Sequence, residues 1–146
     1  MFGGSTAMVR KAPSAPMRYW ADQDLLQGSV LDFGSGNDDN GFTRYDIATH
    51  PDPAVLLVKY DTVICNYVLN VQPSDHLVTQ LLVLMHHLIK PRGRVLVSVL
   101  TDGKAGAFSV GGTIPRTQKQ WAAHISTIFK FKQVNNGFTG FICRRK

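Results

Sequence analysis

A glycine loop between two short apolar strands is the feature that most constrains this chain. Residues 29–33 read Ser-Val-Leu-Asp-Phe, the loop Gly34-Ser35-Gly36 follows, and a second apolar segment ends on Asp46. A dinucleotide-binding loop needs a third glycine and an acid about 20 residues further on, and Asp46 comes far too early for that role. Asp38 and Asp39 would also repel a pyrophosphate at this turn. The loop therefore favours a cationic or zwitterionic ligand over a phosphate.

The rest of the hydrophobic pattern alternates strands with helices. Nearly continuous apolar runs over residues 60–68 and 94–100 are typical of strands buried on both faces. Between them, Ser74 is a suitable N-cap for a helix over 75–89, which a Lys-Pro-Arg-Gly turn ends. A shorter helix is expected over 17–28, closed by Gly28.

The C-terminal part reads as a loop, a helix and a hairpin. Residues 101–115 are rich in glycine, and Pro115 is suited to open a helix whose apolar face carries Trp121 and Ile125. Asn136-Gly137 then separates two strands and is a strong hairpin signal. The pattern predicts an α/β fold with a mostly parallel sheet, helices on both faces and a C-terminal antiparallel hairpin. Ligands of such sheets bind at the carboxyl ends of the strands.

Length and composition indicate one domain, 1–146, with an N-terminal arm over 1–17. The sequence has no apolar run of membrane-spanning length and no apolar segment typical of a signal peptide, so an intracellular, cytoplasmic protein is expected. Cys65 and Cys143 lie in apolar runs without a partner at metal-binding spacing. Neither a disulfide nor a metal site is therefore expected.

The charge is unevenly distributed. Residues 1–100 hold eight Lys/Arg and nine Asp, whereas residues 101–146 hold eight Lys/Arg and one Asp, so the net charge of +6 resides in the C-terminal part. Two interpretations remain open at this point: the charge keeps the protein soluble, or it meets a polyanionic partner.

Four motifs, in order, resemble those of class I S-adenosylmethionine-dependent methyltransferases. They are Val-Leu-Asp-Phe-Gly-Ser-Gly over 30–36, Arg-Tyr-Asp-Ile over 44–47, the strand region 60–71, and residues 87–99 with their Lys-Pro-x-Gly turn. The resemblance implies a Rossmann-like methyltransferase sheet with S-adenosylmethionine as cofactor. Residues 10–17, 45–53 and 66–71 are more narrowly similar to methyltransferases associated with DNA phosphorothioation gene clusters.

The chain departs from the family pattern around the glycine loop. Asn37-Asp38 replaces the usual third glycine, and the distance from Gly36 to Asp46 leaves room for barely one helical turn. The stretch from Asp46 to Asp61 is too short for both a helix and a strand. We therefore predict about six strands instead of seven, with an exposed edge at the second strand. The N-terminal arm or a second copy of the chain, in a homodimer, would cover that edge.

The resemblance also implies a set of cofactor-binding residues. Asp32 would orient the methionine amino group, the glycines would let the backbone approach it, and Asp46 would hold the ribose hydroxyls. Lys11 would face the methionine carboxylate, although a surface lysine is an equal alternative. The full predicted set is Lys11, Asp32, Gly34, Ser35, Gly36, Asp46, Ile47, Asn66, Tyr67 and Val68.

The catalytic candidates are Asn66, Tyr67 and His76. Some amino-group methyltransferases carry Asn/Asp-Pro-Pro-aromatic after this strand, but here both prolines are absent, so methylation of an amino nitrogen is not assigned. Tyr67 is either a wall of the substrate site or a core residue. His76 and His50 are either bases or exposed loop histidines. Methyl transfer needs little acid–base help, because it depends mainly on in-line positioning.

The expected function is methyl transfer to nucleic acid, RNA or DNA. Phosphates would meet Lys104, Arg116 and Lys119, and bases would stack on Phe108 and Tyr67. Two alternatives remain: a methyltransferase of a small molecule or protein, and a non-catalytic S-adenosylmethionine-binding module.

Overall fold

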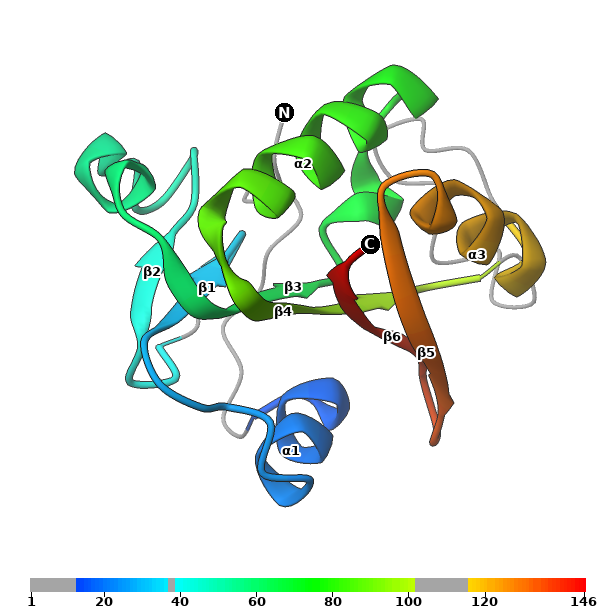
Figure 1. Cartoon of the computed structure of the whole chain (residues 1–146), viewed down its shortest axis with the longest axis horizontal. Helices are drawn as coiled ribbons and strands as arrows, with labels where there is room; N and C mark the ends of the chain where they lie inside the picture. Colours follow the sequence, from blue (N-terminus) through cyan, green and yellow to red (C-terminus); the bar gives the residue numbers. More distant parts are fainter. Residues whose placement is uncertain (1–12, 37–38, 102–115) are drawn as a thin grey trace.

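One six-stranded sheet organises the molecule (Figure 1). The structure is a computed structural model that describes residues 13–36, 39–101 and 116–146. The strand order is β2-β1-β3-β4-β6-β5. The strands are β1 Val30–Phe33, β2 Thr43–Tyr45, β3 Tyr60–Asn66, β4 Ile89–Val99, β5 Phe129–Asn135 and β6 Thr139–Arg145. The helices are α1 Ala15–Asp22, α2 Asp75–Leu88 and α3 Gln118–Ser126, with short 3-10 helices η1 Pro53–Leu57 and η2 Leu69–Val71.

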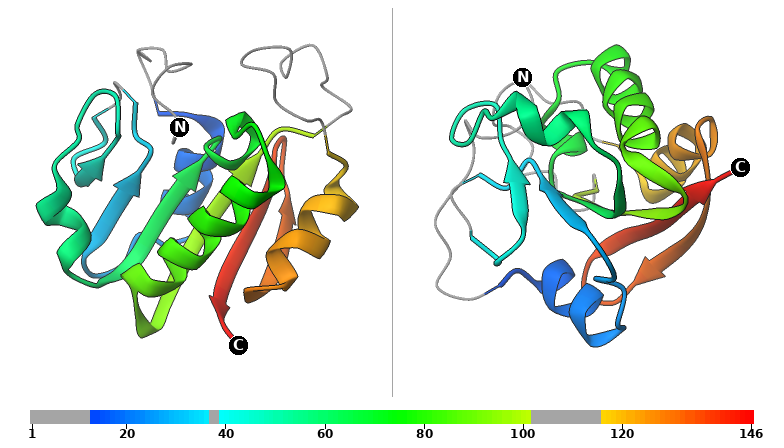
Figure 2. Two further views of the ribbon diagram at one scale, coloured as in Figure 1. Left: turned by 90° about the horizontal axis from the view of Figure 1, so that it is seen from above. Right: turned by 60° about the vertical axis from the view of Figure 1, so that its left-hand side comes forward.

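The sheet has a parallel half and an antiparallel half. Strands β2, β1, β3 and β4 pair in parallel, whereas β6 runs antiparallel to both β4 and β5. The carboxyl ends of β1, β3 and β4 consequently meet at one edge of the sheet (Figure 2). The hairpin turn lies at this same edge, because Val99 pairs with Thr139. The predicted α/β class, mostly parallel sheet and C-terminal hairpin are confirmed.

Helices cover both faces, as predicted. The helix α1 lies on one face, and α2 and α3 lie on the other (Figures 1 and 2). The larger core packs between the sheet and α2 and α3, around Leu81, Trp121 and Phe141. A smaller core lies under α1 and includes Trp20 and Ile64. Successive side chains of a strand point to opposite faces, so burial on both faces explains the continuous apolar runs in the sequence.

The first helix differs from the prediction at both ends. It begins at Ala15, inside the predicted arm, because the Ser14 side chain caps it by accepting a hydrogen bond from the Met17 amide at 3.3 Å. It ends at Asp22 and not at Gly28, since Asp24 adopts a left-handed φ of 57°. Because of this local capping, the helix lies nearer the N-terminus than predicted.

Two further boundaries were also predicted wrongly. The Lys-Pro-Arg-Gly segment is part of β4, which begins at Ile89, and a shift in the β3–β4 register accommodates it. The helix α3 begins at Gln118, where Thr117 and Gln120 form a reciprocal capping box. Pro115 lies outside the described residues.

The sheet has six strands, as predicted, and β2 forms one of its edges. The whole stretch from Asp46 to Asp61 is described and contains η1 but no strand between β2 and β3. Asp52 caps η1 through the Ala54 amide, and the Tyr60 hydroxyl donates to the Val55 carbonyl at 2.6 Å. The homodimer expected at this edge stays a prediction. Among the described residues, no helix is long and apolar enough to cross a membrane.

Arg116 joins α3 to α2. It is 6% exposed, forms an ion pair with Asp75 in the first turn of α2, and places its guanidinium 4.4 Å from the ring centre of Trp121. The Arg116 hydrogen bond and charge hold the pKa of Asp75 below its ordinary value. A group with a depressed folded-state pKa stabilises the fold at pH values above its unfolded pKa.

Asp75→Asn should therefore lower the melting temperature at pH 7, by about 2–4 °C, because it removes the partner of a buried cation. The difference from the unmodified protein should begin to shrink as the pH falls below about 4, where Asp75 of the unfolded chain becomes protonated, and should be lost once the pH passes below the lowered folded-state pKa. Thermal unfolding at several pH values would measure this, with Asp24→Asn in an exposed turn as the control. A difference that is independent of pH would contradict this role of the pair.

Candidate functional site

The glycine loop follows β1 at the carboxyl edge and packs against the end of β3. Gly34 and Gly36 have left-handed φ angles of 74° and 62°. A Cβ atom at Gly34 would lie 2.3 Å from Cγ2 of Val68, so only glycine fits there. The loop and the residues after β3 thus form one packed unit.

The backbone donors of the described part of this loop are all used within the protein. The amides of Gly34 and Ser35 donate to the Tyr45 carbonyl at 2.7 and 3.3 Å, and the Gly36 amide donates to the Asp46 carboxylate at 2.8 Å. A phosphate cradle needs free amide donors at the loop. These contacts therefore agree with the expectation that the loop does not bind a phosphate.

Asp46 is fully buried and links the glycine loop to the turn after β2. Besides the Gly36 amide, its carboxylate accepts hydrogen bonds from the amides of Ala48 and Thr49 at 2.9 and 3.2 Å. The Thr49 hydroxyl donates to the Gly36 carbonyl at 2.5 Å, which closes the same loop from the other side. The position of Asp46 after β2 was predicted from the sequence, but its internal bonding was not.

Asp32 and Ser35 supply the remaining polar groups near the loop. Asp32, at 5% exposure, accepts a hydrogen bond from the Asn40 side chain at 3.2 Å. Its negative charge and burial both raise the pKa of the neighbouring Cys65 thiol, with burial the larger cause. Within the described residues, the buried Ser35 hydroxyl has no hydrogen-bond partner. The site is thus rich in acceptors and acidic, which suits a cation.

The residues after β3 carry an unusual backbone conformation. Tyr67 has a left-handed φ of 60°, and its amide donates to the Ser98 carbonyl at 2.9 Å. A non-glycine residue in this region is uncommon and marks a place where the surrounding structure imposes the conformation. Strained residues of this kind cluster at functional sites, which supports the choice of Tyr67 from the sequence.

Asn66 is tied to α1 and β4. Its side-chain oxygen accepts hydrogen bonds from the Trp20 indole and the Ser98 hydroxyl, both at 3.0 Å. The indole nitrogen is only a donor, so it determines which end of the carboxamide is the oxygen. Asn66 therefore cannot offer a free oxygen to an amino group of a substrate. No motif surrounds Trp20, so its contact with Asn66 could not be predicted from the sequence.

A pocket of about 320 Å³ lies at the carboxyl ends of β3 and β4, beside the hairpin turn. Aromatic residues Tyr67 and Phe138 and neutral polar residues line it, namely Thr101, Gln118, Asn135 and Thr139. The described lining contains no acid or base other than the phenol of Tyr67. This pocket is the candidate acceptor site, since it adjoins both the glycine-loop unit and the end of β4.

Several predicted residues are not brought to this site. Arg116 is buried against Asp75 and Trp121, so its expected contact with phosphates was wrong. His76 is exposed in the first turn of α2 and contacts Gln80. His50 contacts Arg44 and Thr49 on the β2 side. Ile47, predicted at the cofactor site and not at this pocket, is 43% exposed beside Asp46, and its role stays a prediction.

Lys11, Lys104 and Phe108 lie outside the described residues. Lys119 is exposed on α3. Cys65 and Cys143 are both buried and free. In the described part of the chain, no cluster of three or more His, Cys, Asp or Glu side chains is arranged to hold a metal ion.

Solved structures share this architecture. PigF with SAH matches 94% of this chain at 14% identity with a TM-score of 0.62. An O-methyltransferase family protein from Burkholderia thailandensis matches 90% at 13% identity with a TM-score of 0.59. Human N-acetylserotonin methyltransferase in complex with SAM matches 79% at 19% identity with a TM-score of 0.54.

The chain spans 63% of the PigF chain, 57% of the Burkholderia protein and 39% of the human enzyme. No protein-family model matches the sequence, and no curated protein matches it. Identities this low carry information about the fold alone. The described residues therefore have the fold of class I S-adenosylmethionine-dependent methyltransferases.

Proposed function

We propose that this chain binds S-adenosylmethionine and transfers its methyl group to an acceptor held in the pocket beside Tyr67. The observation that carries the proposal is the excess of hydrogen-bond acceptors over unused donors at the glycine loop. The loop's amide donors are used internally, while the Asp32 carboxylate and the Ser35 hydroxyl lie beside the loop. Such a site suits an ammonium and a sulfonium and does not suit a phosphate.

The roles of individual residues follow from this arrangement. Asp32 would bind the methionine amino group, and Gly34, Ser35 and Gly36 would line the methionine part. S-adenosylmethionine supplies an activated methyl group, so the protein needs mainly to align the acceptor with it. Tyr67 and Phe138 would form the apolar wall of the acceptor pocket. Lys11 and Val68 complete the proposed set, with Val68 acting through its packing on Gly34.

Asp46 requires a separate assignment because its carboxylate is fully buried and accepts three amide hydrogen bonds. Accepting both ribose hydroxyls would require it to release some of these amides. We therefore assign Asp46 to the ribose side of the site as the residue that shapes the glycine loop. Its effect on binding would pass through the loop.

The chemical class of the methyl acceptor is a separate part of the proposal. Nucleic acid is the first candidate, supported by the positive charge of residues 101–146. A small molecule is the second candidate, favoured by the volume of about 320 Å³ and the neutral polar lining of the pocket. The link to DNA phosphorothioation rests only on the sequence resemblance.

The pure protein should bind S-adenosylhomocysteine, and Asp32→Asn should weaken this binding by about 1.5–3 kcal/mol, the typical contribution of a hydrogen bond to a charged group. Isothermal calorimetry would measure both. Asp39→Asn is the matched control, because Asp39 is an exposed acid nearby that accepts only the Gly41 amide among its described contacts. A folded protein that gives no heat with either the cofactor or its product would refute cofactor binding.

Asp46→Ala should lower both stability and cofactor affinity, because it leaves buried amides without an acceptor at a cost of about 1–3 kcal/mol. Thermal unfolding and calorimetry would report the two effects. S-adenosylhomocysteine lacking both ribose hydroxyls provides a second test on the unmodified chain. A large loss of affinity for that analogue, with an unchanged melting temperature for Asp46→Ala, would instead indicate direct ribose binding.

Methyl transfer itself requires a turnover experiment. The protein with methyl-labelled S-adenosylmethionine should label one class in a panel of RNA, DNA, protein and small hydroxylated aromatic compounds. Tyr67→Ala should reduce labelling more than cofactor binding, because Tyr67 lines the acceptor pocket. Binding without labelling of any class would favour the non-catalytic module.

A further inference from the structure

Four cations gather on the α1 face of the antiparallel half of the sheet. Lys130 lies directly opposite Arg144 in the β5–β6 pair. Arg94 is the next residue across, because Val95 pairs with Cys143 in the β4–β6 pair. Lys132 lies two residues further along β5. These four residues, Arg94, Arg144, Lys130 and Lys132, are called the basic row below.

The packing establishes which face the basic row occupies. Leu96, Val134 and Ile142 pack in the smaller core under α1. Side chains at alternate positions of a strand share a face, so Arg94 on β4 and Lys132 on β5 point to that same side. Lys130, Lys132 and Arg144 are exposed, and Arg94 is half-buried.

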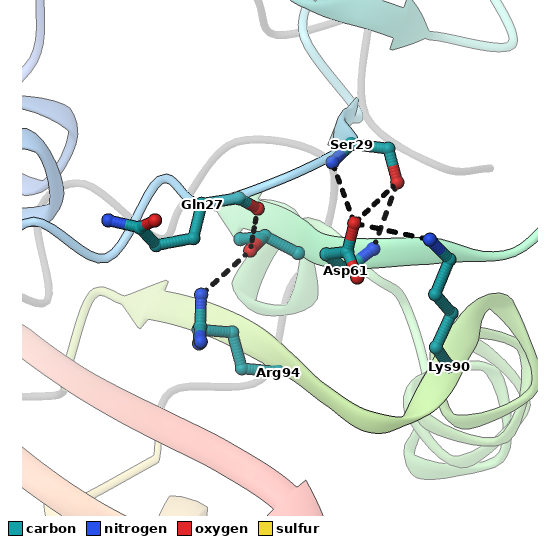
Figure 3. A network of polar contacts seen from close by, with 6 residues as sticks. Gln27, Ser29, Asp61, Lys90 and Arg94 are labelled. Atoms are coloured by element: carbon teal, nitrogen blue, oxygen red, sulfur yellow. Dashed lines mark hydrogen bonds and ion pairs between the residues drawn. The ribbon is translucent and has the colours of Figure 1, made fainter.

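The described contacts of this row are hydrogen bonds to neutral groups, among them that from Arg144 to the Arg92 carbonyl at 3.3 Å, and include no ion pair with an acid. Arg94, labelled in Figure 3, donates to the Leu25 carbonyl and the Thr62 hydroxyl at 3.0 and 3.1 Å. The nearby carboxylate of Asp61 is engaged by Lys90 and by Ser29 (Figure 3). Burial, and then the charge of Arg144, lower the pKa of Arg94.

Like charges directly opposite each other destabilise a sheet. A row of cations across three adjacent strands, spaced about 4.8 Å apart, therefore costs the isolated fold stability. A linear polyanion lying across the strands would turn this cost into attraction. The phosphate backbone of a nucleic acid has the required close spacing of charges.

The surroundings of the row argue against a lipid surface. Membrane-binding faces combine cations with exposed apolar side chains. The large exposed hydrophobic side chains of the described residues are Ile47, Leu57, Val58 and Val83, which belong to the β2–η1 region and α2. Strands β4, β6 and β5 contribute none of them.

We propose that the basic row binds the phosphate backbone of a nucleic acid, independently of base sequence. Lys130 lies five residues along β5 from Asn135 of the acceptor pocket and Lys132 three, which are distances of about 17 and about 10 Å at about 3.4 Å per residue. The row and the pocket lie at opposite ends of β5, so a nucleic acid that crosses the strands at the row would bend along β5 to reach the pocket. The proposal rests on the proposed function in that it identifies the surface that would bind a nucleic-acid acceptor. Binding at the row does not itself require methyl transfer.

The test compares two variants of equal charge change. Lys130→Gln with Arg144→Gln removes two charges from the row, and Lys59→Gln with Lys90→Gln removes two exposed charges outside it, just before β3 and near the start of β4. Fluorescence anisotropy with labelled single-stranded RNA and duplex DNA at 50 and 200 mM salt would give affinities and salt slopes. Calorimetry with S-adenosylhomocysteine on both variants reports on the cofactor site separately.

The row variant should bind both nucleic acids at least tenfold more weakly, with a salt slope smaller by about 2 than that of the unmodified chain. The control should change less than threefold. Equal losses in the two variants would show attraction by net charge alone and overturn the proposal, as would the absence of binding at 50 mM salt. Loss of cofactor binding without loss of nucleic-acid binding would count against the proposed function and leave the row supported.

A stability measurement separates a binding row from a structural one. Lys130→Glu places an acid opposite Arg144, so it should raise the melting temperature while it weakens nucleic-acid binding. A structural role for Lys130 predicts a lower melting temperature instead, and that result would overturn the proposal.

Discussion

The buried carboxylate of Asp46 is the contact on which the geometry of the site depends. In this chain little structure separates the glycine loop from β2, and the Asp46 carboxylate bridges the two by accepting amides from Gly36, Ala48 and Thr49. A buried carboxylate is tolerated only when hydrogen bonds compensate its lost hydration. Asp46 holds the Gly36 amide, and the Tyr45 carbonyl at the end of β2 holds the amides of Gly34 and Ser35. The end of β2 and the residue after it therefore together use the donors of the loop and leave the site rich in acceptors.

A second set of contacts connects the site to the opposite face of the sheet. The Trp20 indole of α1 and the Ser98 hydroxyl of β4 both bind the Asn66 oxygen. Asn66 directly precedes Tyr67, which has a φ of 60° and lines the pocket. The short helix α1 therefore supports the acceptor side of the site, although it contributes no motif of its own.

The sequence predicted the fold well because burial on both faces leaves a strong pattern in the strands. The apolar run of β3, the cap Ser74 and the Asn136-Gly137 turn each report a local requirement, and each lies where expected. Boundaries at α1 and β4 were wrong, because Ser14 provided an earlier cap and because strand pairing absorbed the Lys-Pro-Arg-Gly segment. Pairing between distant segments is invisible to local propensity.

The sequence by itself determined the order of elements, the glycine loop, the acid after the second strand and the excess of positive charge near the C-terminus. Only the tertiary structure decided what these groups do. It buried Arg116 against Asp75 and Trp121, and it turned Asp46 inward. It also aligned Lys130, Arg144 and Arg94 across three strands. The reason is physical: burial, hydrogen-bond partners and the spacing of charges depend on residues far apart in sequence, which only the folded sheet brings together.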